Sequence, residues 1–314
     1  MNRLILYNYR FYCQMIPKTN NRLMDIKTFV FLDIETTGLP RMENNKTKIT
    51  ELCMVAVEAS HIQLGVFPRV QNKLNVCFNP WKLISTESEK MTGLSNPILE
   101  HQSKFSSDTI NTINCFLNHN QKPLCFVAHN GTYFDYPILQ REVEKSGNSL
   151  IDDIVCIDSL HMFRQLHYEE ENVAQVETTA MPSCLSLSIE TTVDETEDGG
   201  NTLPQKILEA KKLNETTPKK QMVETFPSIP NPAKRLKLMS SKTNTDFNIS
   251  FKLSDIYTRM TKRSPIKEHQ AEGDVLMLIT CAATLGEKFV NWANVNAKNF
   301  CDIPSMAPGK KIGT

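Results

Sequence analysis

Two carboxylates, Asp33 and Glu35, interrupt an apolar run that starts at Val30 and reads Val-Phe-Leu-Asp-Ile-Glu. On a β-strand, positions i and i+2 project from one face, with their Cα atoms about 6.5 Å apart. Two acids so close on a buried strand repel each other and lose solvation unless a cation compensates. Carboxylate oxygens are the ligands that Mg²⁺ and Mn²⁺ prefer. The pair therefore indicates a metal site, with a turn-capping role at the end of the strand as the alternative.

Two further acids lie where a helix is expected to begin. Asp135 follows a compact apolar strand predicted over 124–128, and Asp274 opens an apolar helix. Two cations about 4 Å apart need carboxylates from different elements, because each element supplies only one or two. His269 precedes Asp274 on a predicted loop, from which its imidazole could reach a water on a metal. Alone, His269 is a surface histidine and Asp274 a favourable helix N-terminal acid, but the joint pattern indicates hydrolytic chemistry.

The elements that must position these groups are predicted from apolar periodicity and turn residues. The expected strands lie at residues 28–34, 50–60, 69–78, 124–128 and in the first part of 154–166. The expected helices lie at 86–93, 105–118, after 135, in the second part of 154–166, at 251–260, from 274, and at 287–297. The short connection between the second and third strands favours an antiparallel pair, whereas later strands alternate with helices. The predicted fold is an α/β domain with a mixed central β-sheet flanked by helices.

Composition limits the function classes. The 314 residues carry 35 basic and 35 acidic side chains, so a nucleic-acid ligand would have to be held by local charges. The nine cysteines form no Cys-x-x-Cys pair, which favours reduced, packed thiols over a disulfide framework or a zinc site. No apolar stretch approaches the roughly 18 residues of a membrane span, so no membrane partner is expected.

Residues 169–247 differ in composition from the rest of the chain. Acids dominate first, bases follow, and aromatic side chains are scarce, so we expect a long disordered insertion. The expected organisation is a disordered N-terminal extension at 1–26, a domain in two parts at 27–168 and 248–305, the insertion between them, and a C-terminal tail at 306–314.

The insertion also contains a candidate targeting signal. The sequence Pro-Ala-Lys-Arg-Leu-Lys-Leu, which includes Lys234–Lys237, resembles a nuclear localisation signal, and Lys219-Lys220 would complete a bipartite one. A nuclear import receptor is thus an expected partner, with a solvated basic linker as the alternative. Residues 1–24 carry bases without an acid, which also fits mitochondrial targeting as a minor interpretation. We expect a soluble intracellular protein of the nucleus, the cytoplasm or both.

Three motifs carry a family resemblance. In chain order they are Asp-Ile-Glu-Thr-Thr-Gly-Leu from Asp33, His-Asn-Gly-Thr-Tyr-Phe-Asp from His129, and His-Gln-Ala-Glu-Gly-Asp from His269. They resemble the three exonuclease motifs of the DEDDh superfamily. Within that superfamily, Thr-Glu-Leu-Cys at residue 50 and Met-Thr-Gly-Leu-Ser at residue 91 are similar to the three-prime repair exonucleases.

The resemblance implies an RNase H-like fold and a 3′→5′ exonuclease that releases deoxynucleoside 5′-monophosphates from single-stranded or frayed DNA 3′ ends. Two Mg²⁺ ions per site, replaceable by Mn²⁺, would be held by the four acids, which are Asp33, Glu35, Asp135 and Asp274. His269 would be the general base that takes a proton from the metal-activated water. Because a neutral imidazole is required, activity should fall below about pH 6.

The resemblance also assigns the substrate side of the site. The residues so assigned are Leu39, Met91, Thr36, Tyr133 and His269. Leu39 and Met91 would wedge against the terminal bases, which is sequence-tolerant and suits single-stranded ends. This branch usually has a tyrosine before the third acid, whereas the chain has Phe134, so a hydroxyl near the scissile phosphate is missing.

The family pairs edge strands, so a homodimer through residues 69–78 is expected. The short connection between Ala59 and Pro68 resembles the short, soluble form and not the form with a membrane tail. Two alternatives stay open, which are an RNA-directed exonuclease of the same superfamily and a catalytically silent nucleic-acid-binding protein. All five catalytic positions are filled, which argues against the silent protein.

Overall fold

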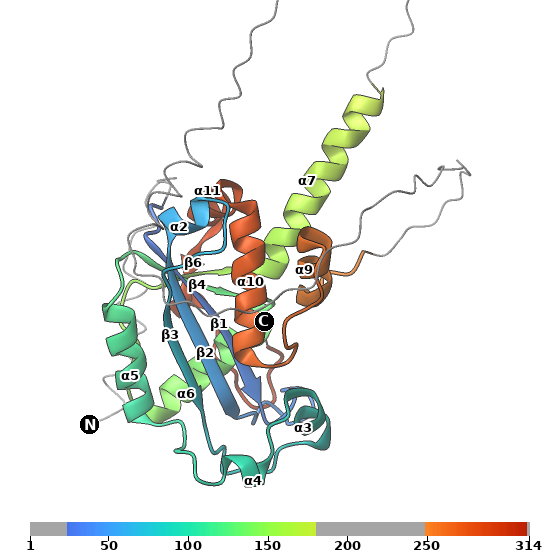
Figure 1. Ribbon diagram of the computed structural model, residues 1–314. Helices are drawn as coiled ribbons and strands as arrows, with labels where there is room; N and C mark the ends of the chain where they lie inside the picture. The colour runs from blue at the N-terminus through green and yellow to red at the C-terminus, as the bar shows by residue number, and fades with distance from the viewer. Residues whose placement is uncertain (1–23, 180–248, 313–314) are drawn as a thin grey trace, which may run out of the picture. The chain divides into compact units, whose positions relative to one another are not determined.

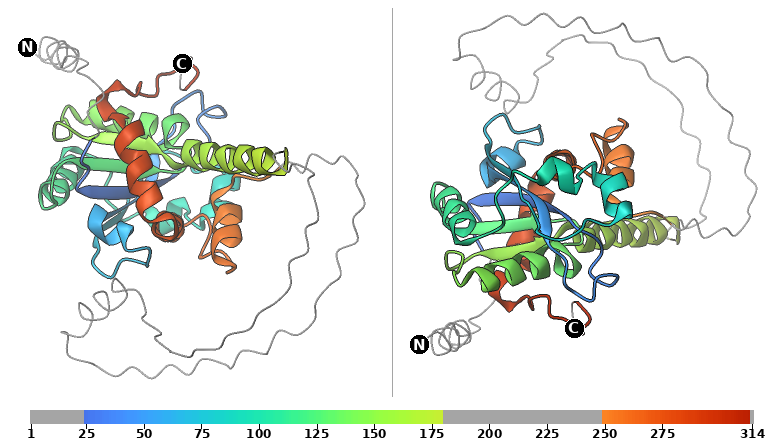
Figure 2. Two further views of the ribbon diagram at one scale, coloured as in Figure 1. Left: turned by 90° about the horizontal axis from the view of Figure 1, so that it is seen from above. Right: turned by 90° about the horizontal axis from the view of Figure 1, so that it is seen from below.

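The computed structural model describes residues 24–179 and 249–312. Most of the expected N-terminal extension and most of the insertion, with its basic motif at Lys234–Lys237, lie outside the described residues. Residues 24–179 and 250–312 belong to one unit, in which helices cover both faces of a central sheet (Figures 1 and 2). No helix in the described ranges is long and apolar enough to cross a membrane.

The sheet is mixed, as the sequence predicts. Its strands are β1 (Thr28–Thr36), β2 (Ile49–Glu58), β3 (Asn72–Cys77), β4 (Leu124–Ala128), β5 (Val155–Asp158) and β6 (Lys298–Asn299). Their order is β3-β2-β1-β4-β5-β6, with β1 antiparallel to β2 and parallel to β4. Both edges of β1 are therefore hydrogen-bonded and both its faces are covered, which explains its nearly continuous apolar sequence. The edge position expected for β3 is also confirmed.

The helices follow the predicted pattern, with three differences. They are α2 (Ala59–Gln63), α3 (Thr86–Thr92), α4 (Asn96–Leu99), α5 (Ser107–Asn118), α6 (Asp135–Ser146), α7 (Ser159–Thr179), α9 (Leu253–Thr261), α10 (Ala271–Leu285) and α11 (Glu287–Asn296), with 3₁₀ turns η1 (Gly131–Tyr133) and η2 (Phe300–Asp302). Helices α2 and α4 were not predicted, because helices of about one turn leave no periodic pattern in the sequence. The helix expected to end by residue 166 continues as α7 to Thr179, beyond the expected domain boundary at 168.

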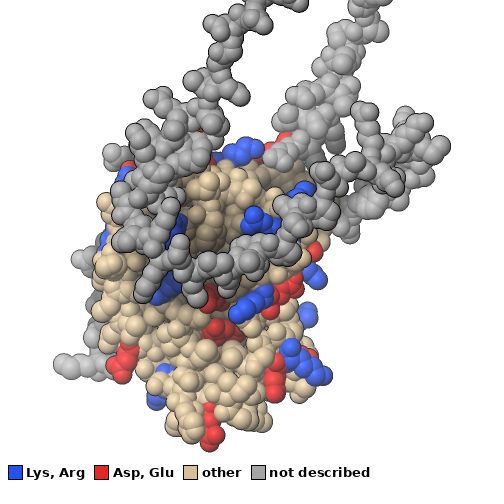
Figure 3. Space-filling model, viewed as in Figure 1, with Lys and Arg blue, Asp and Glu red and all other residues tan. Residues whose placement is uncertain are grey.

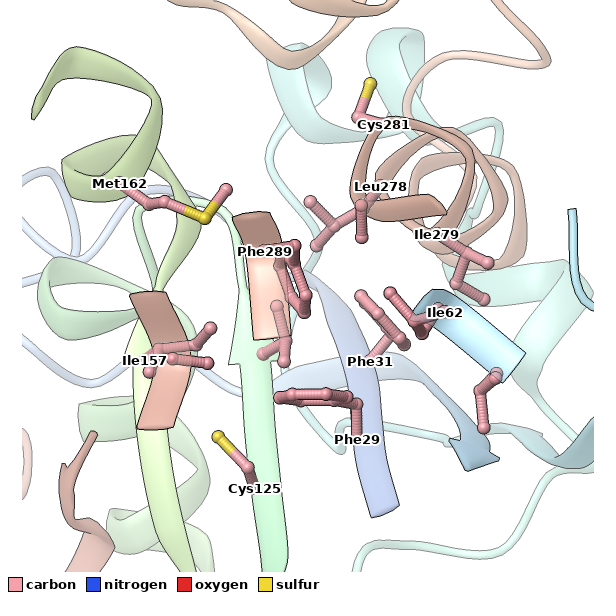
Figure 4. Packing of buried hydrophobic residues seen from close by; sticks show 14 of the residues in the cluster. Phe29, Phe31, Ile62, Cys125, Ile157, Met162, Leu278, Ile279, Cys281 and Phe289 are labelled. Carbon is pink, nitrogen blue, oxygen red and sulfur yellow. The ribbon is translucent and has the colours of Figure 1, made fainter. Parts of the chain in front are cut away.

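The two faces of β1 pack against different helices. On one face, Phe29 and Phe31 meet Phe289 of α11, with ring centroids 4.9 and 6.0 Å apart (Figure 4). Residues from α2, α7 and α10 complete this cluster. On the other face, Val30 and Leu32 pack in a separate cluster with residues of α5 and α6. Both clusters are fully buried at these strand positions, so β1 is held rigidly from both sides.

The alternation that buries the phenylalanines also sets the direction of the acids. Positions 29, 31, 33 and 35 share one face of β1. Asp33 and Glu35 therefore project toward the same side of the sheet as α10, which packs against β1 and β2. The aromatic core and the acidic pair are two ends of one row of side chains.

Two smaller expectations concern the thiols and the C-terminal tail. Among the cysteines within the described ranges, Cys53, Cys125, Cys156 and Cys281 are buried as packed thiols, whereas Cys115 and Cys301 are exposed. The expected tail begins with Met306, which is buried and whose N–H donates to the carbonyl of Pro137 at 2.9 Å. Asn45 Nδ2 also donates to the carbonyl of Ala307 at 2.8 Å, so the start of this segment is packed onto the domain.

Candidate active site

Three carboxylates meet at the C-terminal end of β1. One oxygen from each of Asp33, Glu35 and Asp274 lies within 4.8 Å of the other two. The first two come from β1, and Asp274 comes from the first turn of α10. Since β1 continues to Thr36, Asp33 and Glu35 lie within the strand and not in a turn after it.

Asp135 lies beside this group and is 1% exposed. Its Oδ1 accepts a hydrogen bond of 3.2 Å from the backbone N–H of Ile34, the residue between the two acids of β1. It enters at the first residue of α6, where the helix dipole favours a negative charge. The structure thus brings the four predicted acids together from three elements, although Asp135 is not one of the three whose oxygens meet within 4.8 Å.

Burial and mutual repulsion raise the pKa of each of these acids. Burial, followed by the charges of Asp135 and Glu35, keeps the pKa of Asp33 well above its ordinary value. Burial likewise raises the pKa of Glu35 to about 9, of Asp135 to about 8 and of Asp274 to about 6. A divalent cation would relieve both causes at once. The donor set, carboxylate oxygens only, fits a hard ion such as Mg²⁺ or Mn²⁺.

His269 lies on the exposed loop between α9 and α10. Its backbone N–H donates to Asp274 Oδ2 at 3.0 Å, and its φ of +61° is in the left-handed region. The loop approaches α10 so closely that a Cβ on Gly273 would lie 2.4 Å from the carbonyl oxygen of Lys267. Glycine at position 273 therefore lets the loop pass over the helix and hold His269 next to Asp274. The role of its imidazole as general base stays a prediction.

The two predicted wedge residues are exposed on elements that are bonded together. Leu39 is 50% exposed in the loop after β1, and Met91 is 56% exposed on α3. The backbone N–H of Ser85, the N-cap of α3, donates to the carbonyl of Thr37 at 2.8 Å. The hydroxyl of Ser88 donates to the carbonyl of Thr36. Helix α3 is thus fixed to the residues that directly follow the acidic pair.

The remaining predicted substrate residues differ in exposure. The side chain of Thr36 is buried, and its hydroxyl donates to the carbonyl of Gly38 at 3.1 Å, which stabilises the turn after β1. Tyr133, two residues before Asp135, is 57% exposed. Phe134, which replaces the usual tyrosine, packs partly buried against the core on the α5–α6 side of the sheet. Its ring therefore has a packing role.

Comparison with known proteins decides the family. A model of the exonuclease family (RNase T) matches residues 30–189, just over half of the 314 residues. The chain belongs to the exonuclease family. The match begins with β1 and includes the motifs that contain Asp33, Glu35 and Asp135.

Relatives within this family are three-prime repair exonucleases. The chain is 28% identical to bovine three-prime repair exonuclease 1 over 295 residues, which cover 90% of this chain and 70% of the bovine protein. It is 39% identical to human three prime repair exonuclease 2 over 150 residues, which cover 45% of this chain and 62% of the human protein. Among solved structures, exonuclease I from E. coli in complex with a dT13 oligonucleotide superimposes with a TM-score of 0.48 at 13% identity, covering 83% of this chain and 41% of that chain.

A further acid beside this group, on β2, was not predicted from the sequence. Glu51 lies directly opposite Glu35 in the β1–β2 ladder. Its Oε2 accepts a hydrogen bond of 3.3 Å from the backbone N–H of Ala271, the first residue of α10. It also adds to the repulsion that raises the pKa of Glu35, after burial and the charge of Asp274. The acid belongs to the Thr-Glu-Leu-Cys segment of the family resemblance, but only the β1–β2 register shows which residue it lies opposite.

A second missed acid, Asp158, supports the turn that leads to Asp135. Asp158 Oδ1 accepts from the backbone N–H of Asn130 at 3.0 Å, and its Oδ2 accepts from that of Thr132 at 3.1 Å. The nearby His129 of the same motif bonds Ser159 through Nδ1 and the carbonyl of Phe251 through Nε2, at 2.9 Å each. Because a carbonyl only accepts, Nε2 carries the proton and Nδ1 accepts from the serine hydroxyl. His129 therefore joins the two described parts of the chain and is not available as a ligand.

Proposed function

We propose that the chain is a metal-dependent 3′→5′ exodeoxyribonuclease that releases deoxynucleoside 5′-monophosphates. The observation that carries the proposal is the meeting of carboxylates from β1 and α10 within 4.8 Å, in a member of the exonuclease family. The relatives are named for three-prime repair, which favours a DNA 3′ end as the substrate. Asp135 is buried, the other three acids are partly buried, and no lysine or arginine of the described residues forms an ion pair with them. Such a group of acids is the arrangement that a two-metal phosphodiesterase requires.

In this proposal the four acids Asp33, Glu35, Asp135 and Asp274 hold two Mg²⁺ ions, which Mn²⁺ can replace. The ions, when bound, would neutralise charge on the scissile phosphate. His269 would take the proton of the attacking water, and its exposure leaves the imidazole open to solvent and substrate. The hydrogen bond from its backbone to Asp274 fixes the loop relative to the acids.

The wedge residues define the proposed substrate end. Leu39 and Met91 are exposed apolar side chains on segments fixed to the end of β1, so they can take up unstacked terminal bases without sequence preference. That arrangement favours single-stranded or frayed ends. Tyr133, which is exposed and precedes Asp135 by two residues, is the candidate for contact with the terminal nucleotide.

Assembly and location are further parts of the proposal. The unpaired edge of β3 could join that of a second copy, giving a homodimer with a continuous sheet. An import receptor that recognises Lys234–Lys237 would bring the protein into the nucleus, and without that interaction it would stay in the cytoplasm. Sedimentation and imaging of a tagged chain with and without these lysines test the two points.

The decisive experiment measures mononucleotide release from 3′-labelled single-stranded DNA and from RNA of the same sequence, in Mg²⁺ and in EDTA. The variants are His269→Ala and Asp274→Asn, and the matched control is Glu272→Gln, a half-exposed acid in the same turn of α10 that pairs with Lys73 and not with the acidic group. We expect Mg²⁺-dependent release from DNA that both site variants lose and the control keeps.

Two results would contradict the proposal in different ways. Faster release from RNA than from DNA would favour an RNA-directed exonuclease. Retention of labelled DNA by the wild type without release, in both Mg²⁺ and Mn²⁺, would identify a nucleic-acid-binding protein with an inactive acidic site.

A further inference from the structure

Trp81 is the most unusual exposed side chain near the site. Its indole is 80% exposed, whereas Trp292 is 9% exposed and donates its Nε1–H to Gln165 at 3.1 Å. Tryptophan is seldom left in water without a ligand or partner, because its large ring gains most from being covered. Trp81 also has a φ of +49°, a strained conformation for a bulky residue.

The loop that presents Trp81, residues 79–84 between β3 and α3, is fixed on both sides of the ring. Asn79 Oδ1 accepts from the backbone N–H of Trp81 at 3.0 Å, and Asn79 Nδ2 donates to the carbonyl of Glu100 at 3.0 Å. On the other side, Asn96 accepts from the N–H of Ile84 at 2.9 Å and donates to the carbonyl of Lys82 at 2.8 Å. The structure therefore holds the indole in solvent on a rigid support.

The same loop is connected to the proposed nucleotide site. The ammonium of Lys82 lies 2.6 Å from Glu43 Oε1, and Glu43 Oε2 accepts from the hydroxyl of Thr37 at 2.8 Å. Thr37 is two residues from the wedge residue Leu39. The loop with Trp81 and the segment with Leu39 are thus parts of one bonded support.

The groups around Trp81 match the chemistry of single-stranded nucleic acid. The Lys104 ammonium lies 5.9 Å from the centroid of the indole, and Leu83 beside it is 83% exposed. An aromatic ring that stacks on a base, with a basic side chain at its edge for the phosphate, is the usual platform for single strands. Figure 3 shows basic and acidic side chains over the lower end of α10 and also on the side of α3, which carries Glu87, Glu89 and Lys90.

We infer that Trp81 and Lys104 form a base-stacking site for the DNA strand upstream of its 3′ end. The inference rests on the proposed function and adds a contact beyond the terminal nucleotides. The indole stacks on one base and Lys104 contacts the adjoining phosphate. Long strands are then held while the end is processed, and strands too short to reach Trp81 gain nothing.

The test compares Trp81→Ala and Trp81→Phe with the control Ile98→Ala, which removes another exposed apolar side chain, on α4. The substrates are oligo(dT) strands of about 4 and about 20 nucleotides. We expect Trp81→Ala to raise KM about tenfold for the long strand only, with kcat unchanged, since stacking on one base contributes about 1–3 kcal/mol. Trp81→Phe should recover most of the loss.

A second measurement does not depend on catalysis. In EDTA, the long oligo(dT) should quench the tryptophan emission of the wild type and have little effect on Trp81→Phe, whose remaining tryptophan is buried. No quenching, or a KM for the long strand that is the same in Trp81→Ala as in the wild type, overturns the inference even if DNA is degraded normally. A change of oligomeric state in Trp81→Ala would also overturn it, by assigning the ring to a contact between copies. If the wild type degrades no DNA, the proposed function fails separately.

Discussion

Along the face of β1 directed at α10, Phe29 and Phe31 are followed at the same two-residue spacing by Asp33 and Glu35. The aromatic half meets Phe289 and loses its contact with water, which stabilises the fold. The acidic half is also largely removed from water, but there burial and repulsion favour the protonated carboxyls. One strand thus has an end that stabilises the protein and an end that destabilises it until cations arrive. This is the expected signature of a site selected for chemistry.

The largest expected effect separates activity from stability at the acidic end. Asp33→Asn should lower mononucleotide release by about a thousandfold or more, because a metal ligand is lost. The same change should leave the melting temperature in EDTA unchanged or higher, since one repelling acid is gone. Calorimetry and the release assay, with the exposed-acid control Asp108→Asn, check both points. A fall in both activity and stability would show that Asp33 supports the fold directly.

At the aromatic end of β1, a substitution is expected to lower the stability of the fold. Phe31→Ala should lower the free energy of unfolding by about 3–5 kcal/mol, because it leaves a cavity against Phe289. Phe67→Ala removes a half-exposed ring and should change the free energy of unfolding by about 0.5 kcal/mol or less. Urea denaturation measures the free energy of unfolding of both variants. Equal effects of the two substitutions would mean that the β1 face is not the stabilising core described above.

Displacing the loop that carries His269 should have the next largest effect on activity. In a helix interior, Gly→Ala ordinarily stabilises by about 1 kcal/mol. At Gly273 the added Cβ would lie 2.4 Å from the Lys267 carbonyl oxygen, so the loop must move. We expect kcat to fall about a hundredfold, as for other displacements of about 1 Å at a site. Glu272→Ala, in the same turn, is the control. Unchanged kcat in Gly273→Ala would show that the loop does not position a catalytic group.

The acidic end also predicts a pH dependence with a definite sign. The folded-state pKa values of Glu35, Asp135 and Asp274, about 9, 8 and 6, exceed the ordinary values near 4. Their contribution to stability is thus complete below about pH 4 and is lost as the pH rises through these values. In EDTA, the melting temperature should fall by several degrees from about pH 5 to about pH 9. Glu35→Gln should flatten the slope, and a melting temperature that rises over this range would contradict the assignment.

The contrast between the two ends also shows what the sequence could predict. Alternation along β1 was enough to place Asp33 and Glu35 on one face, and the start of α10 was enough to mark Asp274 as a helix N-terminal acid. Neither local pattern could predict that Glu51 lies opposite Glu35, because this pairing depends on the register between β1 and β2. The fixed loop around Trp81 was missed for a related reason, since its support comes from Asn96 and Glu100, which lie on another segment.

The smallest expected effect concerns Glu51, which is placed to act through both its charge and its hydrogen bond to Ala271. Glu51→Gln keeps an acceptor for the helix and removes a negative charge that raises the pKa of Glu35 and Asp274. Activity at about pH 8 should stay within about threefold, while the acidic limb of the pH–rate profile moves to lower pH. Glu51→Ala also removes the acceptor and should lower kcat further, without a further shift of the profile. If both variants shift the profile equally and keep the same kcat, Glu51 acts through charge alone, and the first turn of α10 is positioned by packing against β1 and β2.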